Sequence, residues 1–271
     1  MIDIEKLSAS VPKSENEYIG SDGLIRCQEC GKVVETIIDV PLWGKRKVRC
    51  ICECMKKEMD AAAEQAKKEK NDRNRKICFS GSALMSCTFE GSEVTEHLEA
   101  AKNYTDHFRE FKKMGKGLLL YGEVGTGKSH IAACIANQLI DEGYKVLMTN
   151  FATMVNILQA SFEGKQEYIN SLNRYSLLII DDLGAERKSE FMQEQVYNII
   201  DARYRSGLPM IITTNLTIKQ LTEPAEIGFS RIYDRILERC HPMELTGDSR
   251  RIIKGRAGYK QTKMILKGEP T

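Results

Sequence analysis

Four short apolar runs stand in the second half of the chain, and polar segments with helical spacing separate them. The runs are Leu118-Leu119-Leu120-Tyr121, Lys145-Val146-Leu147-Met148-Thr149, Tyr175 to Asp182, and Met210 to Asn215. Near-continuous apolar strands that alternate with helices are typical of a parallel sheet covered on both faces. We expect one helix over about 93–113, and a second from the loop that follows the first run to Gly143. Two more are expected over 151–162 and over 191–205. The pattern predicts an α/β fold.

The first part of the chain has a different pattern. Residues 1 to about 20 are polar, and a hairpin is expected between two groups of cysteines that follow. Residues 55–76 are rich in helix formers and nearly free of large apolar side chains, which predicts a solvated connecting helix. We therefore expect three parts: a small domain over 1–54, a charged helical linker over 55–77, and a larger domain over 78–271.

Composition adds limits to this organisation. With 42% hydrophobic residues among 271, the chain can build a core, and its 40 basic and 38 acidic residues leave a formal charge of only +2. Twelve basic against six acidic residues gather between Lys45 and Lys76, as on a solvated face or, alternatively, a surface for DNA or an acidic partner. No apolar run reaches the roughly 20 residues of a membrane span, so we expect a cytoplasmic protein without membrane contact.

A glycine-rich loop follows the first apolar run and leads into a helix. Gly122-Glu123-Val124-Gly125-Thr126-Gly127-Lys128-Ser129 fits the pattern G-x-x-x-x-G-K-[ST] in the strand-to-helix context that a phosphate-binding loop requires. Its backbone amides and the helix N-terminus would bind the phosphates of ATP, Lys128 would contact the β- and γ-phosphates, and Ser129 would ligate Mg²⁺. The predicted nucleotide-binding residues are Gly122 to Ser129 together with His130.

Polar side chains end the two later strands. Asp181 and Asp182 follow Leu177-Leu178-Ile179-Ile180, and Asn215 follows Ile211-Ile212-Thr213-Thr214. We expect Asp181 to hold Mg²⁺ through water, Asp182 to orient or deprotonate the attacking water, and Asn215 to polarise that water or hold the γ-phosphate. Helix capping is the alternative role for Asp182 and Asn215.

Five cysteines in the small domain form two groups. Cys27 and Cys30 have the C-x-x-C spacing, and Cys50-Ile51-Cys52-Glu53-Cys54 follows the expected hairpin. Four sulfurs brought together in this way can bind Zn²⁺ in a tetrahedron, and cytosolic cysteines are more often metal ligands or buried thiols than disulfides. We predict Cys27, Cys30, Cys50 and Cys52 as ligands, with Cys54 as the alternative to Cys52. Reduced surface thiols remain the other interpretation.

The nucleotide motifs resemble those of the AAA+ ATPases, and among them the DnaC/DnaI-type replicative helicase loaders and the IstB-type transposition helpers. The resemblance covers roughly residues 80–255, with Walker A at 122–129, Walker B at 177–182 and sensor 1 at Asn215. Residues 229–239 are similar to the segment with the arginine finger, in which Arg235 matches best and Arg231 is the alternative. Arg251 resembles the sensor 2 arginine. Walker B ends here in Asp-Asp rather than the usual Asp-Glu.

This resemblance implies a function. It implies an ATP-dependent loader that hydrolyses ATP, binds single-stranded DNA, grips a hexameric replicative helicase through the zinc domain, and self-associates through the ATPase domain. The basic stretch Ser249–Thr271, with seven basic residues and one acidic, fits a flexible tail along a phosphate backbone or a merely solvated one. The alternatives are a transposition helper, an ATP-gated adaptor with negligible turnover, and a zinc-containing nucleoside kinase.

Overall fold

The computed structural model describes residues 16–41, 44–160, 164–184, 190–224 and 226–267. The chain divides into two compact units, Met1–Lys70 and Asn71–Thr271. This division lies inside one long helix, α2 (Glu53–Phe79), which covers the segment predicted as a helical linker. Among the helices that the structure describes, none has the length and apolar character of a membrane-spanning segment.

The first unit consists of two small antiparallel sheets and the start of α2. Strand β1 (Glu17–Ile19) pairs with β2 (Ile25–Cys27), and β3 (Glu35–Val40) pairs with β4 (Gly44–Arg49). The second pair confirms the hairpin expected between the cysteine groups. A small core contains Cys27, Val34, Cys52 and Met55. So few buried side chains provide little hydrophobic stabilisation, and a domain of this size commonly needs a metal or a disulfide.

The second unit is built on five parallel strands in the order β6-β7-β8-β5-β9. The strands are β5 (Gly117–Tyr121), β6 (Val146–Asn150), β7 (Leu177–Leu183), β8 (Met210–Thr214) and β9 (Cys240–Glu244). This sheet confirms the predicted α/β fold. Because β5, β7 and β8 are neighbours, the phosphate-loop sequence and both later polar strand ends come out at one edge of the sheet.

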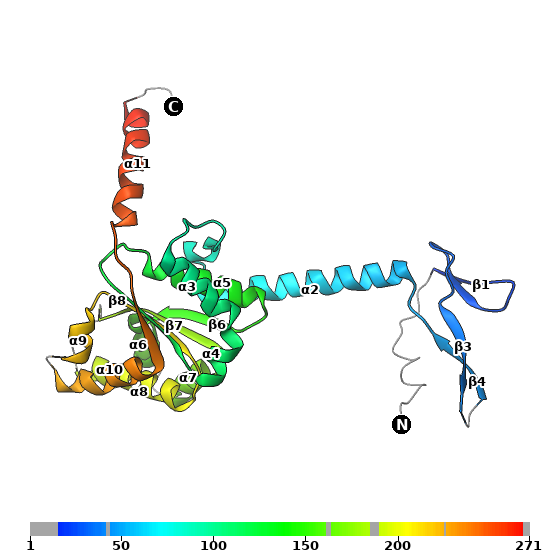
Figure 1. Cartoon of the computed structure of the whole chain (residues 1–271), viewed down its shortest axis with the longest axis horizontal. Coiled ribbons are helices and arrows are strands. Elements are labelled where there is room, and N and C mark those ends of the chain that lie inside the picture. Colours follow the sequence, from blue (N-terminus) through cyan, green and yellow to red (C-terminus); the bar gives the residue numbers. More distant parts are fainter. Residues whose placement is uncertain (1–15, 42–43, 161–163, 185–189, 225, 268–271) are drawn as a thin grey trace. The chain divides into compact units, whose positions relative to one another are not determined.

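Helices cover both faces of the sheet (Figure 1). One face carries η1 (Ala83–Ser86), α3 (Glu96–Asp106), α4 (Phe108–Met114) and α5 (Lys128–Asp141). The other carries α6 (Phe151–Ala160), α7 (Lys165–Leu172), α8 (Glu190–Arg205), α9 (Ile218–Thr222) and α10 (Ile227–Arg239). Along β7, Leu177 and Ile179 belong to the first core and Leu178 and Ile180 to the second, as strand alternation requires.

Several elements differ from the predictions. The helix expected over 93–113 is two helices, because His107 leaves helical geometry with φ −105° and ψ 18°. The last turns of α2 are not only solvated: Arg75 Nε donates to Asn137 Oδ1 at 3.0 Å and so ties this part of α2 to α5. The segment expected as a flexible tail contains α11 (Arg250–Leu266).

Candidate functional site

The glycine-rich loop between β5 and α5 adopts a conformation that requires its glycines. Gly122, Gly125 and Gly127 have φ values of 136°, 90° and 101°. A Cβ atom on Gly125 would lie 2.1 Å from Ser249 Oγ, and one on Gly122 would lie 2.2 Å from the Leu245 carbonyl oxygen. The loop is therefore closely packed against the chain that follows β9, while α5 begins at Lys128 with its N-terminus at the loop.

Lys128 is folded back over this loop. Its side chain is buried, and Nζ donates to the carbonyl oxygens of Gly122 at 2.9 Å and Glu123 at 2.6 Å. Burial lowers the pKa of Lys128, while the nearby carboxylates of Asp182 and Asp181 act in the opposite direction. A desolvated ammonium group held by neutral carbonyls is well suited to bind an anion, because an anion would supply the countercharge that the carbonyls lack.

Asp181 lies at the end of β7, next to the start of α5. Its Oδ1 accepts from Ser129 Oγ at 2.8 Å and from Thr213 Oγ1 at 2.6 Å. Burial raises the pKa of Asp181, and the two hydroxyl donors counteract this increase. The predicted magnesium residues Ser129 and Asp181 are thus in direct contact. A hydroxyl and a carboxylate form an oxygen donor set that suits Mg²⁺.

Thr213 is a site residue that the sequence analysis did not single out. Besides donating to Asp181, its Oγ1 accepts from the backbone N–H of Asp182 at 2.9 Å. Asp182 has a positive φ of 57°, next to an irregularity in the β7–β8 pairing between Ile180 and Leu183. Thr213 therefore fixes both aspartates. Only the strand pairing reveals this role, since the sequence shows one apolar strand ending in two threonines.

A cavity of about 550 Å³ opens beside the loop. Nine of its lining residues were predicted for nucleotide binding or catalysis: Val124, Gly125, Gly127, Lys128, Ser129, His130, Asp182, Asn215 and Arg251. Six others were not: Leu84, Gly91, Ser92, Glu93, Arg250 and Ile253. The segment 84–93 has no recognisable motif, and it enters the site because Ser92 Oγ lies 2.7 Å from His130 Nε2. Four other predicted residues of the site are not part of this lining: Gly122, Glu123, Thr126 and Asp181.

Arg235, the predicted arginine finger, does not line this cavity. Its Nη2 lies 3.0 Å from Asp201 Oδ1, and its guanidinium group stacks on the rings of Tyr197 and Tyr204 at 4.9 and 5.5 Å. Arg231, the alternative, is exposed one helical turn earlier on α10. Within one chain, neither arginine is part of the nucleotide cavity.

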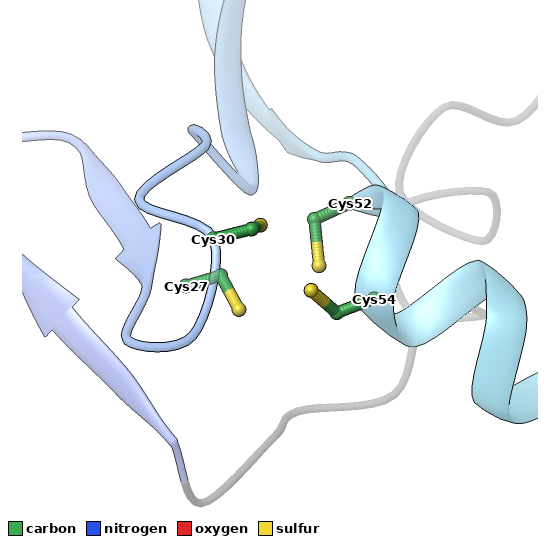
Figure 2. Close-up of side chains that lie close together, drawn as sticks. All are labelled: Cys27, Cys30, Cys52 and Cys54. Carbon is green, nitrogen blue, oxygen red and sulfur yellow. The ribbon is translucent and has the colours of Figure 1, made fainter.

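A second candidate site lies in the first unit. The sulfur atoms of Cys27, Cys30, Cys52 and Cys54 all lie within 4.8 Å of one another. Figure 2 shows Cys27, the last residue of β2, and Cys30, on the loop that follows, facing Cys52 and Cys54 at the start of α2. A tetrahedron with Zn–S bonds of about 2.3 Å would place its sulfurs about 3.8 Å apart, so this group needs little adjustment to bind a metal ion.

The structure corrects one member of the predicted ligand set. Cys50 lies outside the group, with its thiol 3.9 Å from the Val48 carbonyl oxygen, and Cys54 takes its place. The reason is that α2 begins at Glu53: the Met55 N–H points at Cys52 Sγ at 3.4 Å, and the first helical turn brings Cys54 to the same side. The backbone N–H of Lys32 lowers the pKa of Cys30 to about 7, which favours a thiolate.

Comparison with known proteins agrees with this geometry. The profile of a family described as IstB-like ATP binding protein matches residues 56–257. The replicative helicase loader DnaI of Bacillus subtilis (strain 168) is 28% identical over 184 residues, which are 62% of this chain and 59% of that protein. The replicative helicase loader DnaC of Escherichia coli (strain K12) is 27% identical over 157 residues, 56% of this chain and 63% of that protein.

Two solved structures have the same fold. A crystal structure of DnaI aligns with a TM-score of 0.54 and 25% identity, over 66% of this chain and 99% of that one. A crystal structure of the DnaC helicase loader aligns with a TM-score of 0.53 and 20% identity, over 61% of this chain and all of that one. The chain thus spans about three fifths of the length of the two curated relatives.

Proposed function

This chain belongs to the IstB-like ATP-binding family, and on that premise we propose that it is an ATP-dependent loader of a replicative DNA helicase. The observation that carries the proposal is the cavity in which the glycine loop, the ends of β7 and β8, and the start of α11 meet. The fold that surrounds this cavity is similar to the crystal structures of DnaI and of the DnaC helicase loader, which supports the proposal.

We propose that ATP binds in this cavity and is hydrolysed there. The loop amides and Lys128 would bind its phosphates, and Ser129 with Asp181 would hold Mg²⁺, which supplies positive charge at the phosphates. Asp182 and Asn215, both on the cavity wall, are suited to accept from and orient the attacking water. Arg251 adds a positive charge to the lining of the cavity, which supports a role in sensing the phosphates.

For the first unit we propose a structural zinc ion on Cys27, Cys30, Cys52 and Cys54. All-thiolate sites with closed coordination stabilise small domains and do not catalyse reactions. Since the hydrophobic core of this unit is so small, the metal would be its main stabilising element. A rigid small domain of this kind suits a docking role, and we assign to it the grip on the hexameric helicase.

The remaining proposed partners follow from the ATP-binding domain. Arg235 lies outside its own chain's cavity, which supports delivery of an arginine to a neighbouring chain and thus self-association. Single-stranded DNA is the proposed nucleic-acid partner. A protein acting on a replicative helicase and DNA would work in the cytoplasm.

A transposition helper is the second candidate function, because the family itself is described as IstB-like. The cysteine group of the first unit favours the loader.

The decisive experiment measures ATP hydrolysis alone, with single-stranded DNA, and with a purified hexameric helicase. A loader predicts stimulation by DNA and a stable complex with the helicase, whereas a nucleoside kinase predicts phosphate transfer to nucleosides and an adaptor predicts negligible turnover. Lys128→Ala should abolish ATP binding and retain bound zinc. Normal ATP affinity in this variant would contradict the assignment of the loop.

A further inference from the structure

The last helix, α11, differs in charge from the rest of the molecule. Its 17 residues include no acidic residue and six basic ones: Arg250, Arg251, Lys254, Arg256, Lys260 and Lys263. Taking these six from the 40 basic residues of the chain leaves 34 basic against 38 acidic. The other residues are therefore net negative as a set, whereas α11 carries six basic residues and no acidic residue of its own.

This helix also exposes large side chains. No other helix or strand in the described part of the chain packs along α11 (Figure 1), and Ile252, Tyr259 and Leu266 are 57%, 72% and 82% exposed. These three residues recur every seven positions, so they form a row on one side of the helix. Arg256 and Lys263 follow the same seven-residue spacing beside that row, and both are exposed. An aromatic and aliphatic row flanked by basic residues is thus presented to solvent.

We propose that α11 is the surface that holds single-stranded nucleic acid, an inference that rests on the proposed loader function. The phosphate backbone is the polyanion that a helix with six basic residues and no acidic residue attracts most strongly. The exposed Tyr259 ring offers a platform for an unstacked base, which a single strand provides and an intact duplex does not. A second α11 is a poor occupant, because two such helices would bring twelve positive charges together without an acidic partner.

The position of α11 connects this surface to the nucleotide. Its first-turn residues Arg250, Arg251 and Ile253 line the ATP cavity, and the Arg250 N–H donates to the Gly125 carbonyl oxygen of the glycine loop at 3.0 Å. The helix proposed to bind DNA thus begins at the glycine loop that is proposed to bind the phosphates of ATP. For this reason the test variants leave Arg250 and Arg251 unchanged.

The test measures binding of a fluorescent oligothymidylate to the full chain with a non-hydrolysable ATP analogue, across a range of salt concentrations. The first variant combines Lys254→Gln, Arg256→Gln, Lys260→Gln and Lys263→Gln. We expect affinity to fall about tenfold or more, and the slope of log K against log salt to flatten by about 3, since each phosphate contact on a single strand contributes about 0.7. The matched control changes Lys56, Lys67, Lys68 and Lys70 on α2 to Gln and should bind as wild type does.

A second pair of variants tests the stacking surface. Tyr259→Ala should weaken binding about tenfold, whereas Tyr259→Phe, which keeps the ring, should bind nearly as tightly as wild type. Binding of the ATP analogue verifies that each variant is folded.

Three results would overturn the inference. The first is undiminished DNA binding by the α11 variants, and the second is an equal loss of DNA affinity in the α2 control. The third is a smaller assembly of the α11 variants in sedimentation with unchanged DNA affinity, which would make α11 a protein interface. In each of these the loader proposal stands, while failure of wild type itself to bind any single strand would refute the DNA part of that proposal as well.

Discussion

At the residue scale, the nucleotide site depends on a few ionisable side chains whose charged form is destabilised by burial. Asp181 is a carboxylate in a partly buried position, and that burial raises its pKa above the usual value of an aspartate. The native state therefore binds this proton more tightly than the unfolded chain does. It follows that stability contributed at this position is lost as the pH rises from the unfolded value through the raised native value.

Asp181→Asn should consequently separate stability from function. Its amide oxygen can still accept from Ser129 and Thr213, but no charge is buried, so the nucleotide-free variant should melt a few degrees higher than wild type at pH 8. Near pH 3, where the wild-type carboxyl is protonated, the two should melt alike. Magnesium-dependent ATP hydrolysis should be lost. Calorimetry without Mg²⁺ or nucleotide checks this, and an unchanged melting temperature at pH 8 would contradict the account of the buried charge.

Thr213 provides the second residue-scale prediction. Thr213→Val removes the hydroxyl that donates to Asp181 and leaves the Asp182 N–H without its acceptor, which should cost about 1–3 kcal/mol of folding stability. Because both aspartates lose their anchor, ATP turnover should fall at least about tenfold with a smaller change in ATP affinity.

Thr214→Val is the matched control for this change. Thr214 is also fully buried, but its hydroxyl donates to the Leu183 carbonyl oxygen and contacts neither aspartate. It should lose stability while keeping turnover, as denaturant unfolding and steady-state kinetics will measure. Equal loss of turnover in both variants would reduce Thr213 to a structural residue.

At the element scale, the sequence predicts most of the second unit because each strand is a local apolar run. The strands at 118–121, 145–149, 175–182 and 210–215 appear within two residues of the structure's limits. Strand β9 was missed because Cys240-His241-Pro242-Met243-Glu244 lies on the sheet edge and is largely exposed, so it carries no apolar signature. The predicted start of α2 was two residues late. With this small error, the predicted ligand set contained Cys50 where the structure has Cys54.

The cysteine group gives the element-scale prediction. Cys54→Ser should lower the zinc content and unfold the first unit, because the proposed metal, rather than the four buried residues of its core, would be the main source of its stability. Cys50→Ser should keep one zinc per chain. Atomic emission and limited proteolysis of the full chain measure both effects. Retained zinc in Cys54→Ser with loss in Cys50→Ser would restore the ligand set predicted from sequence.

At the scale of the whole molecule, the sequence identifies the residues of the site. It does not show whether one chain supplies all of them or two neighbouring chains share them. Arg235 matches a catalytic position, yet in this chain it is held by Asp201 and two tyrosine rings, and its assignment as a finger stays a prediction. An arginine outside its own cavity can act only on another chain's nucleotide. A single chain would then be a slow ATPase, and assembly would provide the missing charge at the transition state.

Mixing two inactive variants tests this distribution. Arg235→Ala keeps every residue of its own cavity, and Asp182→Asn keeps Arg235, so a mixed assembly contains sites made of an intact cavity and an intact arginine. We expect the mixture to hydrolyse ATP well above the sum of the separate variants, increasingly so at higher protein concentration. Because Arg235→Ala also removes the Asp201 ion pair, its melting temperature must be measured alongside. A folded mixture with no gain at any concentration would show that Arg235 does not act between chains.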